Sequence, residues 1–236
     1  MQLVRNDRLI RNRVRLASAA HVGALAIFGG SLLVTMQPWY EQEQWWWAYS
    51  AIVLGLLLYN FGQHHLRRYG PKFRLDGAFT QALKGLDARY TLFAFVSPKL
   101  PDLLIVGPNG VHAIVPRTQS GSIVCRADRW SRIRGRFGLL GALFVQPLRN
   151  PSQDARRAVE RTRQFLEPRL GEDAESIAFH AAIVFAHPQA RLRIDGCSYA
   201  VTTLKELRNH LRKAKASLST KQVARVAKAI QQEIRA

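Results

Sequence analysis

Cysteine is scarce in this chain, with only Cys125 and Cys197 among 236 residues. A structural zinc site uses about four ligands in paired clusters, and no spacing of Cys and His here has that pattern. We interpret the adjacent His64 and His65 as a polar pair at a membrane surface rather than as metal ligands. Both cysteines fall in a part of the chain that the charge pattern below assigns to the cytoplasm, so we expect reduced thiols.

Acidic residues are also few, because the chain has 16 Asp and Glu against 35 Lys and Arg, a formal net charge of +19. Such an excess favours polyanionic partners, namely nucleic acid or anionic lipid. Internal repeats and low-complexity tracts are missing as well. Their absence fits a single α/β or α+β domain of ordinary size in the part after the apolar runs.

Charged residues are missing from two long apolar runs near the start of the chain. Residues 17–36 are apolar apart from His21 and small hydroxyl side chains, and residues 45–62 hold no charge at all. A helix needs about 20 apolar residues to cross the hydrocarbon layer of a membrane. We therefore predict two transmembrane helices, with a buried pair of soluble core helices as the alternative. The predicted domains are a membrane anchor over residues 1–70 and a soluble domain over residues 71–236.

Positive charge is missing between the two runs, where residues 37–44 are acidic, aromatic and amide-rich. Basic residues instead precede the first run and follow the second: Arg5, Arg8, Arg11, Arg13, Arg15, Arg67, Arg68, Lys72 and Arg74. Arg and Lys stay on the cytoplasmic side of a membrane, and Trp and Tyr prefer its interface. We therefore expect a multi-pass protein of the cell membrane with both termini and the soluble domain in the cytoplasm. The far interface is marked by Trp39, Tyr40, Trp45, Trp46 and Trp47.

Residues 101–117 have the pattern of a β-hairpin, because two apolar runs flank the sequence Gly107-Pro108-Asn109-Gly110. Proline pre-sets φ at the second position of a turn, asparagine tolerates the third, and glycine supplies positive φ at the fourth. With this turn, Asp102 lies across from Val115 or within one residue of it. Val115 and Arg117 share a face, since strand side chains alternate.

This hairpin, followed by Gly121 and Trp130, resembles the nuclease-related domain called NERD, a distant branch of the PD-(D/E)XK nuclease superfamily. The resemblance extends to residues 77–81 upstream, to residues 150–157 downstream, and to the apolar strand at residues 181–185. It implies a restriction-endonuclease-like α/β or α+β fold, in which helices flank a sheet.

Nucleases of this superfamily hold a divalent metal with two carboxylates, assisted by a lysine and often by a glutamate on a helix. By resemblance, Asp102 matches the first acid, but Val115 stands at the second acid and Arg117 at the lysine. Ala78 stands at the position of the helix glutamate, which leaves Gln81 as the closest polar substitute. Valine and alanine cannot ligate a metal, and Mg²⁺ demands oxygen ligands. We therefore predict a degenerate site that holds no metal or other cofactor and has no hydrolytic activity.

An active, Mg²⁺-dependent nuclease is the alternative, if Asp87 or Asp128 has taken the place of the missing acid. Asp154 stands where the resemblance places a glutamine, and we interpret it as an acid in the first turn of a helix, where the dipole favours it. Pro116 removes a donor from the strand beside the site. We expect the strand to bend or end there.

The leading hypothesis is that the soluble domain binds nucleic acid without cleaving it, because arginines cluster in two stretches. The candidate phosphate contacts are Arg129, Arg132, Arg134, Arg136, Arg156 and Arg157. A scaffold module is the second alternative, with its basic surface on anionic lipid or on a protein partner.

Hydrophobic periodicity predicts the remaining elements. Strands are expected at residues 90–96, 122–125, 177–186 and 199–202, with a closing turn at residues 128–130. Helices are expected at residues 78–86, from Asn150 as N-cap onward, at residues 203–215, and after Thr220. Residues 132–146 are ambiguous, because their apolar part fits either the core or a membrane surface.

Overall fold

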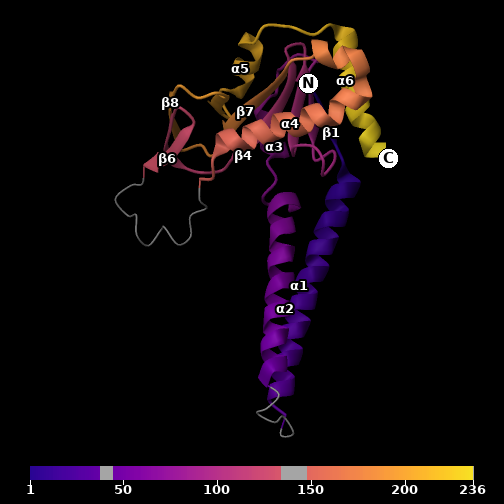
Figure 1. The fold of residues 1–236 in the computed structure, drawn as a ribbon, viewed down its shortest axis with the longest axis vertical. Helices are drawn as coiled ribbons and strands as arrows, with labels where there is room; N and C mark the ends of the chain where they lie inside the picture. Colours follow the sequence, from indigo (N-terminus) through magenta and orange to yellow (C-terminus); the bar gives the residue numbers. More distant parts are fainter. Residues whose placement is uncertain (38–44, 134–147, 236) are drawn as a thin grey trace. The chain divides into compact units, whose positions relative to one another are not determined.

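The computed structural model describes residues 1–37, 45–133 and 148–235 of the chain, which forms two compact units (Figure 1). Met1–Asn6 and Leu75–Ala236 make the first, here called the sheet unit, and Asp7–Arg74 make the helical unit. The boundary lies four residues beyond the predicted one, and the first six residues belong with the sheet. Several predicted features fall outside the described residues: Trp39 and Tyr40 at the interface, Arg134 and Arg136, and the ambiguous apolar run at residues 137–145.

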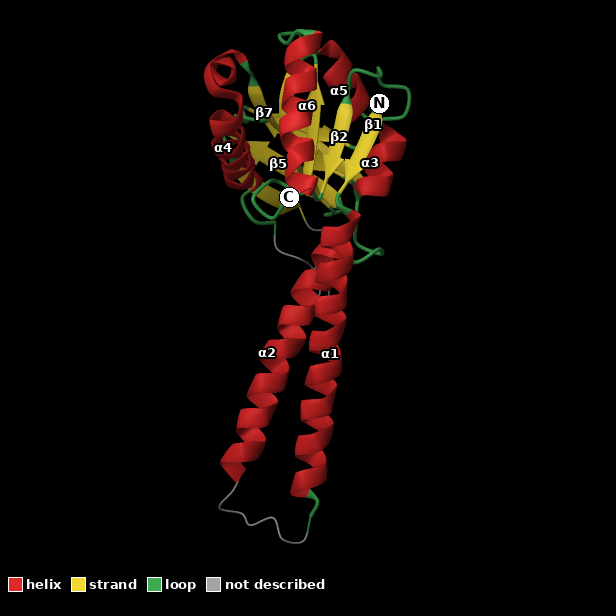
Figure 2. Cartoon of the chain, turned by 90° about the vertical axis from the view of Figure 1, so that its right-hand side faces the viewer, coloured by secondary structure: helices red, strands yellow, loops and turns green. Residues whose placement is uncertain are grey.

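The helical unit consists of α1 (Asp7–Thr35) and α2 (Trp45–Tyr69), which run antiparallel and side by side (Figure 2). Gly62 shows how closely they approach, since a Cβ atom there would lie 2.5 Å from the imidazole of His21. Small residues at such a seam allow close backbone contact, which is how membrane helices associate without a hydrophobic driving force.

Apolar side chains cover much of the outside of both helices. The exposed large hydrophobic residues include Leu16, Val22, Leu25, Leu32, Leu33, Ile52, Val53, Leu54, Leu56, Leu57 and Phe61. Within the described residues, α1 is the one helix that is long and apolar enough to cross a membrane. The expectation of two such helices is therefore met by one. In α2 the tryptophans at its start and the polar Asn60 and Gln63 near its end lower the mean hydropathy.

The sheet unit has a mixed α/β fold with two sheets, as the sequence predicted in outline. The larger sheet has the order β1-β2-β3-β4-β7-β9, formed by Gln2–Arg5, Thr91–Ala94, Leu103–Gly107, Gly110–Arg117, Phe179–Phe185 and Ala200–Thr203. The smaller sheet has the order β6-β5-β8, formed by Arg129–Ile133, Gly121–Arg126 and Ala190–Asp195. The helices are α3 (Asp76–Ala82), α4 (Pro151–Leu170), α5 (Leu207–Lys213) and α6 (Thr220–Arg235), with a 3-10 helix at Gly171–Ser176.

Strand β1 was not expected, because Arg5 is predicted to belong to the basic flank of a membrane helix. It pairs in parallel with β2, from Gln2 opposite Thr91 to Arg5 opposite Ala94. The Arg5 guanidinium donates to the carboxylate of Asp76 at 2.9 Å, and Asp76 is only 4% exposed. These contacts make the start of the chain an edge strand of the main sheet.

Helix α4 forms for the reasons that the sequence suggested. The Asn150 side chain accepts hydrogen bonds from the backbone N–H groups of Ser152 and Gln153 at 3.0 and 3.3 Å, and Pro151 is the first helical residue. Its apolar stripe is buried as predicted and consists of Ala155, Ala158, Thr162, Phe165 and Leu166, with Val159 partly buried. Helices α4 and α6 share one core with strands β2, β3, β4 and β7 (Figure 2).

Two other predicted boundaries are corrected. The turn expected at residues 128–130 consists of Ala127 and Asp128, which have φ angles of 45° and 60°, whereas Arg129 and Trp130 already lie in β6. The helix expected from Thr203 begins only at Leu207, although the Thr203 hydroxyl does donate to the Glu206 carboxylate at 2.9 Å. In both cases the local motif is present, but its position relative to the element is shifted.

Candidate functional site

The hairpin of β3 and β4 has the predicted register. The resemblance places a metal site where β3 begins and β4 ends. Leu103 pairs with Ile114, so Asp102 lies opposite Val115, and Gly110 closes the turn with a φ of 112°. Val115 is 8% exposed and belongs to the core shared with α4. No oxygen ligand therefore faces Asp102 from this position.

Of the two outcomes predicted at Pro116, a bend or an end of the strand, the end is wrong. Strand β4 continues to Arg117 and pairs with β7 through Pro116 opposite Val184. The proline is tolerated because β3 begins only at Leu103, opposite Ile114, so the missing N–H faces no partner strand at this position.

Arg117, which stands at the lysine of the resemblance, forms an ion pair with Asp154 in the first turn of α4. The predicted place of Asp154 in the first turn is confirmed. Asp154 has a second role as well, since its carboxylate binds the Arg117 guanidinium. It is therefore not a free second acid for Asp102.

The other predicted site residues do not add a metal ligand beside Asp102. Ala78 and Gln81 are exposed on α3, whose buried side chains are Asp76 and Phe79. Asp87 accepts hydrogen bonds from Arg89, chiefly from its side chain, and these keep the pKa of Asp87 below its usual value.

The two acids considered as replacements have other positions or partners. Asp87 precedes β2, whereas Asp102 lies beyond the other end of that strand. Asp128 occupies the turn between β5 and β6, and its carboxylate accepts hydrogen bonds from Ser152 and Ser198. Among the described residues, the one group of three possible metal ligands is Cys125, Asp128 and Cys197, with ligand atoms within 4.8 Å of one another.

The two cysteines form a disulfide, so the expectation of reduced thiols is wrong for this structure. Cys125 lies in β5 and Cys197 in the connection between β8 and β9, at positions 72 residues apart in the chain. Sequence spacing does not reveal such a pairing, since it arises only when β8 adds to β5. The group with Asp128 is thus a disulfide beside a carboxylate rather than a formed metal site.

A basic surface lies on one side of the smaller sheet. Across β5 the register places Arg126 opposite Arg129 of β6, Val124 opposite Arg193 of β8, and Ser122 opposite Arg191. Opposite residues share a face and alternate residues return to it. Four exposed arginines therefore point to the same side, which also carries the exposed Asp195 opposite Arg126. We call these arginines the basic face: Arg126, Arg129, Arg191 and Arg193.

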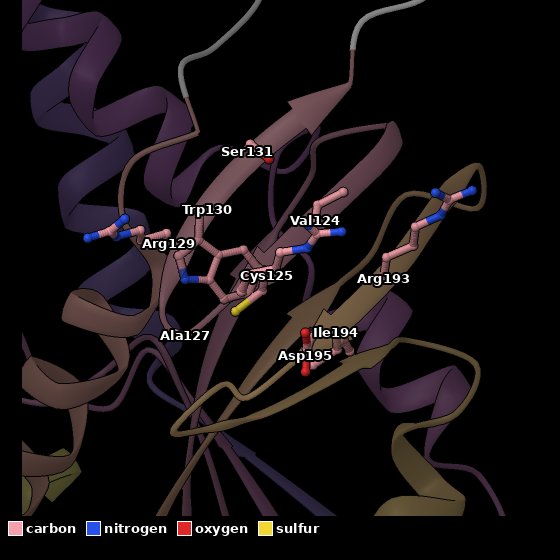
Figure 3. A pocket seen from close by; sticks show the side chains of 10 residues that line it. Val124, Cys125, Ala127, Arg129, Trp130, Ser131, Arg193, Ile194 and Asp195 are labelled. Atoms are coloured by element: carbon pink, nitrogen blue, oxygen red, sulfur yellow. The ribbon is translucent and has the colours of Figure 1, made fainter.

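The basic face borders a groove of about 830 Å³ that β5, β6 and β8 line (Figure 3). Its lining includes Arg126, Arg129, Trp130, Arg193 and Asp195. Trp130 is anchored rather than free, since its indole N–H donates to the Ser152 hydroxyl at 2.8 Å and its ring lies 6.1 Å from that of Phe185. The groove is thus rich in guanidinium groups, and its one aromatic ring is held by the core.

Asp128 fastens the hairpin that carries two of the four arginines. Its carboxylate accepts hydrogen bonds from the Ser198 hydroxyl, the Ser198 backbone N–H at 3.1 Å and the Ser152 hydroxyl at 2.7 Å. These bonds, chiefly those from Ser198, lower the pKa of Asp128. They connect the β5–β6 turn to the start of α4 and to the connection after β8.

The predicted nucleic-acid contacts divide into three groups. Arg129 lies on the basic face, whereas Arg132 belongs to the opposite face of β6 and donates to the Ser120 hydroxyl at 3.2 Å. Arg134 and Arg136 lie outside the described residues. The third group, Arg156 and Arg157, is exposed on α4, with Arg157 3.8 Å from the carboxylate of Asp154.

Arg191 and Arg193 were missed, because no element was expected between residues 186 and 199. The signal was present in the sequence Arg191-Leu192-Arg193-Ile194-Asp195, where charged and apolar residues alternate. This period of two is typical of a strand with one solvated face.

Comparison with family models, with curated proteins and with solved structures gives no match for this chain. The contacts and exposures of its own residues therefore carry the functional argument.

Proposed function

We propose that this protein is a membrane-anchored module that binds nucleic acid through the basic face and does not hydrolyse it. The observation that carries the proposal is the set of four exposed guanidinium groups on one side of a three-stranded sheet. Within the described part of the chain, none of the four forms an ion pair with a carboxylate. Arginine is well suited to phosphate, since its planar fork donates two parallel hydrogen bonds.

The expected mode of binding is contact with phosphates rather than with bases. The aromatic ring at the groove, Trp130, is held against Phe185 and Ser152, so it offers no free platform for base stacking. Contacts to phosphate position a protein on nucleic acid but carry no sequence information directly. We therefore expect weak sequence preference and a strong dependence of affinity on salt.

The proposed lack of hydrolysis is supported by the surroundings of Asp102, which supply no second acid among the described residues. Val115 faces that carboxylate, and Asp154 is committed to Arg117. A relation to NERD nuclease-related domains is part of the proposal. The support for it is the predicted hairpin register, the Asn150 cap of α4, and the parallel pairing of β7 with β4.

A multi-pass anchor with both ends in the cytoplasm completes the proposal. Strand β1 precedes α1 and pairs with β2, which follows α2. This pairing supports a topology in which both flanks of the helical unit lie on the same side of a membrane. If α1 crosses, the chain has to cross back before Thr91, and α2 with its exposed apolar side chains is the segment that can do so. The basic flanks favour the cytoplasmic side.

The test uses the full-length protein in nanodiscs of uncharged lipid, because residues from both ends of the chain build the sheet unit. Fluorescence anisotropy would measure the affinity for 30-nucleotide single-stranded and duplex DNA. The variant removes the basic face by changing Arg126, Arg129, Arg191 and Arg193 to alanine. Its matched control changes four exposed basic residues at and beside α5 to alanine: Lys205, Arg212, Lys213 and Lys215.

Both variants lower the net charge by four, so they separate the basic face from overall charge. We expect the basic-face variant to lose most of its affinity and the control to stay close to wild type. Equal losses in the two variants would mean that only net charge matters. Binding to vesicles of anionic lipid without binding to DNA would favour the scaffold alternative.

A further inference from the structure

We propose that Cys125 and Cys197 form a reversible thiol–disulfide site that latches the basic face in its binding geometry. The redox part of this proposal concerns the two cysteines alone. Its effect on binding rests on the function proposed above, and the experiment below separates the two.

The two cysteines are placed for reversible bonding. Their Cα atoms are 6.4 Å apart, within the usual span of about 4.4–6.8 Å for a disulfide. Cys125 is 1% exposed in β5, whereas Cys197 is partly exposed in the connection after β8. Cys197 is thus the more exposed residue of the pair, and Cys125 is the buried one.

The bond holds together the pieces that carry the basic face. Cys125 directly precedes Arg126, and Cys197 directly precedes Ser198, which donates two hydrogen bonds to Asp128 in the β5–β6 turn. The disulfide and the Asp128 contacts therefore fasten the same connection to the same hairpin. Once the bond is broken, the connection is held at this hairpin by polar contacts near the surface, which compete with water.

Strand β8 depends on the same attachment. It contributes Arg191 and Arg193, pairs only with β5 in its sheet, and ends two residues before Cys197. Edge strands with exposed side chains open at low free-energy cost. Reduction should therefore loosen β8 against β5 and separate its two arginines from Arg126 and Arg129.

The exchange chemistry assigns different roles to the two sulfurs. A thiolate of a dithiol reductant attacks Cys197 Sγ, the disulfide breaks, and Cys125 leaves as a thiolate that takes up a proton. The second thiol of the reductant then attacks the mixed disulfide, which releases the Cys197 thiol and the oxidised reductant. The pair thus gains two electrons and two protons, and an oxidised dithiol carrier reverses the reaction.

A metal is the other occupant that two cysteines beside a carboxylate suggest. Asp128 does not favour it, because its two oxygens already accept three hydrogen bonds from Ser152 and Ser198. The cytoplasmic side proposed for the sheet unit favours redox exchange, since disulfides there are usually transient.

The redox state is tested in intact cells. Acid quenching would be followed by alkylation of free thiols with a polyethylene-glycol maleimide, which adds a mass step for each thiol. We expect two steps in growing cells and none after treatment with a thiol oxidant, with recovery of both steps on its removal. A pair that stays oxidised, or one that never oxidises, would overturn the reversible site.

The latch is tested on the purified full-length protein in uncharged nanodiscs, oxidised or treated with dithiothreitol. We expect reduction to speed amide hydrogen exchange in residues 190–199 and not in β3 or β4, and to weaken binding of 30-nucleotide DNA by at least threefold. The double variant Cys125→Ser and Cys197→Ser should bind the DNA as weakly as the reduced protein does, and dithiothreitol should not change its affinity.

The outcomes are distinguishable. Unchanged exchange in residues 190–199 on reduction would overturn the latch. Changed exchange in a protein that binds DNA in neither redox state would overturn the proposed function and leave the redox site standing. Equal DNA binding in both redox states, with binding intact, would overturn the coupling between the latch and the basic face.

Discussion

Val115 occupies the position opposite Asp102 where a divalent metal would need a second oxygen ligand. We predict that the wild-type protein does not cleave nucleic acid with Mg²⁺ or Mn²⁺. The double change of Val115 to Glu and Arg117 to Lys should restore metal affinity before activity, because the surrounding contacts were not built for catalysis. Calorimetric titration with Mn²⁺ and a plasmid-cleavage assay check both statements. Metal-dependent cleavage by wild type that disappears in Asp102→Ala would show that the site is active.

His112 provides a second residue-scale prediction. It is 3% exposed, stacks on His180 with ring centroids 5.0 Å apart, and its Nε2 has no hydrogen-bond partner within the described residues. Burial first, then the nearby His180 and His210, lowers the pKa of His112 to about 3. Between about pH 6.5 and pH 3, the unfolded chain therefore binds a proton at this histidine, whereas the folded protein keeps the imidazole neutral.

The stability of the sheet unit should therefore be complete above about pH 6.5 and fall between there and pH 3, by about 1.4 kcal/mol per pH unit from this group. Thermal unfolding between pH 8 and pH 4 measures the slope. His112→Phe should flatten it, whereas His187→Gln, which changes a histidine outside the core, should not. A slope that persists unchanged in His112→Phe would assign the pH dependence to other groups.

Among single residues, the sequence predicted the features that depend on near neighbours in the chain. The turn at Gly107–Gly110 and the Asn150 cap are each determined by a few neighbouring residues. The disulfide was not predictable, because Cys125 and Cys197 meet only after β8 has paired with β5. The ion pair of Arg117 with Asp154 likewise needs α4 to pack on β4.

At the scale of elements, β1 makes the sharpest prediction, since adjacent residues of one short strand have different environments. Val4 packs against the core of the sheet unit, whereas Leu3 is exposed on the other side. Val4→Asp should lower the free energy of unfolding by about 2–3 kcal/mol, because it places a charge against apolar side chains. Leu3→Asp, the matched control, should cost less than about 0.5 kcal/mol.

Differential scanning fluorimetry of the full-length variants would compare the two melting temperatures. Equal melting temperatures for Val4→Asp and wild type would mean that β1 does not contribute to the sheet. This strand escaped sequence analysis for a physical reason. Four residues carry too little periodicity to be recognised, and β1 exists only because Thr91–Ala94, far along the chain, pairs with it.

Helices were predicted better than strands, because their apolar stripes are encoded locally. The stripes of α4 and α6 are buried at the expected positions, including Ala155, Leu166, Val226 and Ile230. Strand β8 was missed although its alternation is visible. It lies between two more apolar strands, and only its pairing with β5 converts that alternation into a basic face.

At the scale of the whole molecule, the charge pattern and the β1–β2 pairing both favour the proposed topology, in which both flanks of the helical unit are cytoplasmic. A single cysteine placed at Gln42, which lies outside the described residues, should be labelled by an impermeant maleimide in intact cells. A cysteine at Gln232 should stay unlabelled until the membrane is opened. Both would be made in the double-serine background, so that Cys125 and Cys197 do not react. Labelling of Gln232→Cys in intact cells would mean that the sheet unit lies outside the cytoplasm, contrary to the proposal.

The most direct test of nucleic-acid binding is the slope of log affinity for duplex DNA against log salt concentration. Each phosphate contact contributes a slope of about −0.9. Wild type should therefore have a slope steeper by roughly 3–4 than the variant that lacks Arg126, Arg129, Arg191 and Arg193. The control that lacks Lys205, Arg212, Lys213 and Lys215 should keep the wild-type slope within about one. A basic-face variant with the wild-type slope would contradict the proposed interface.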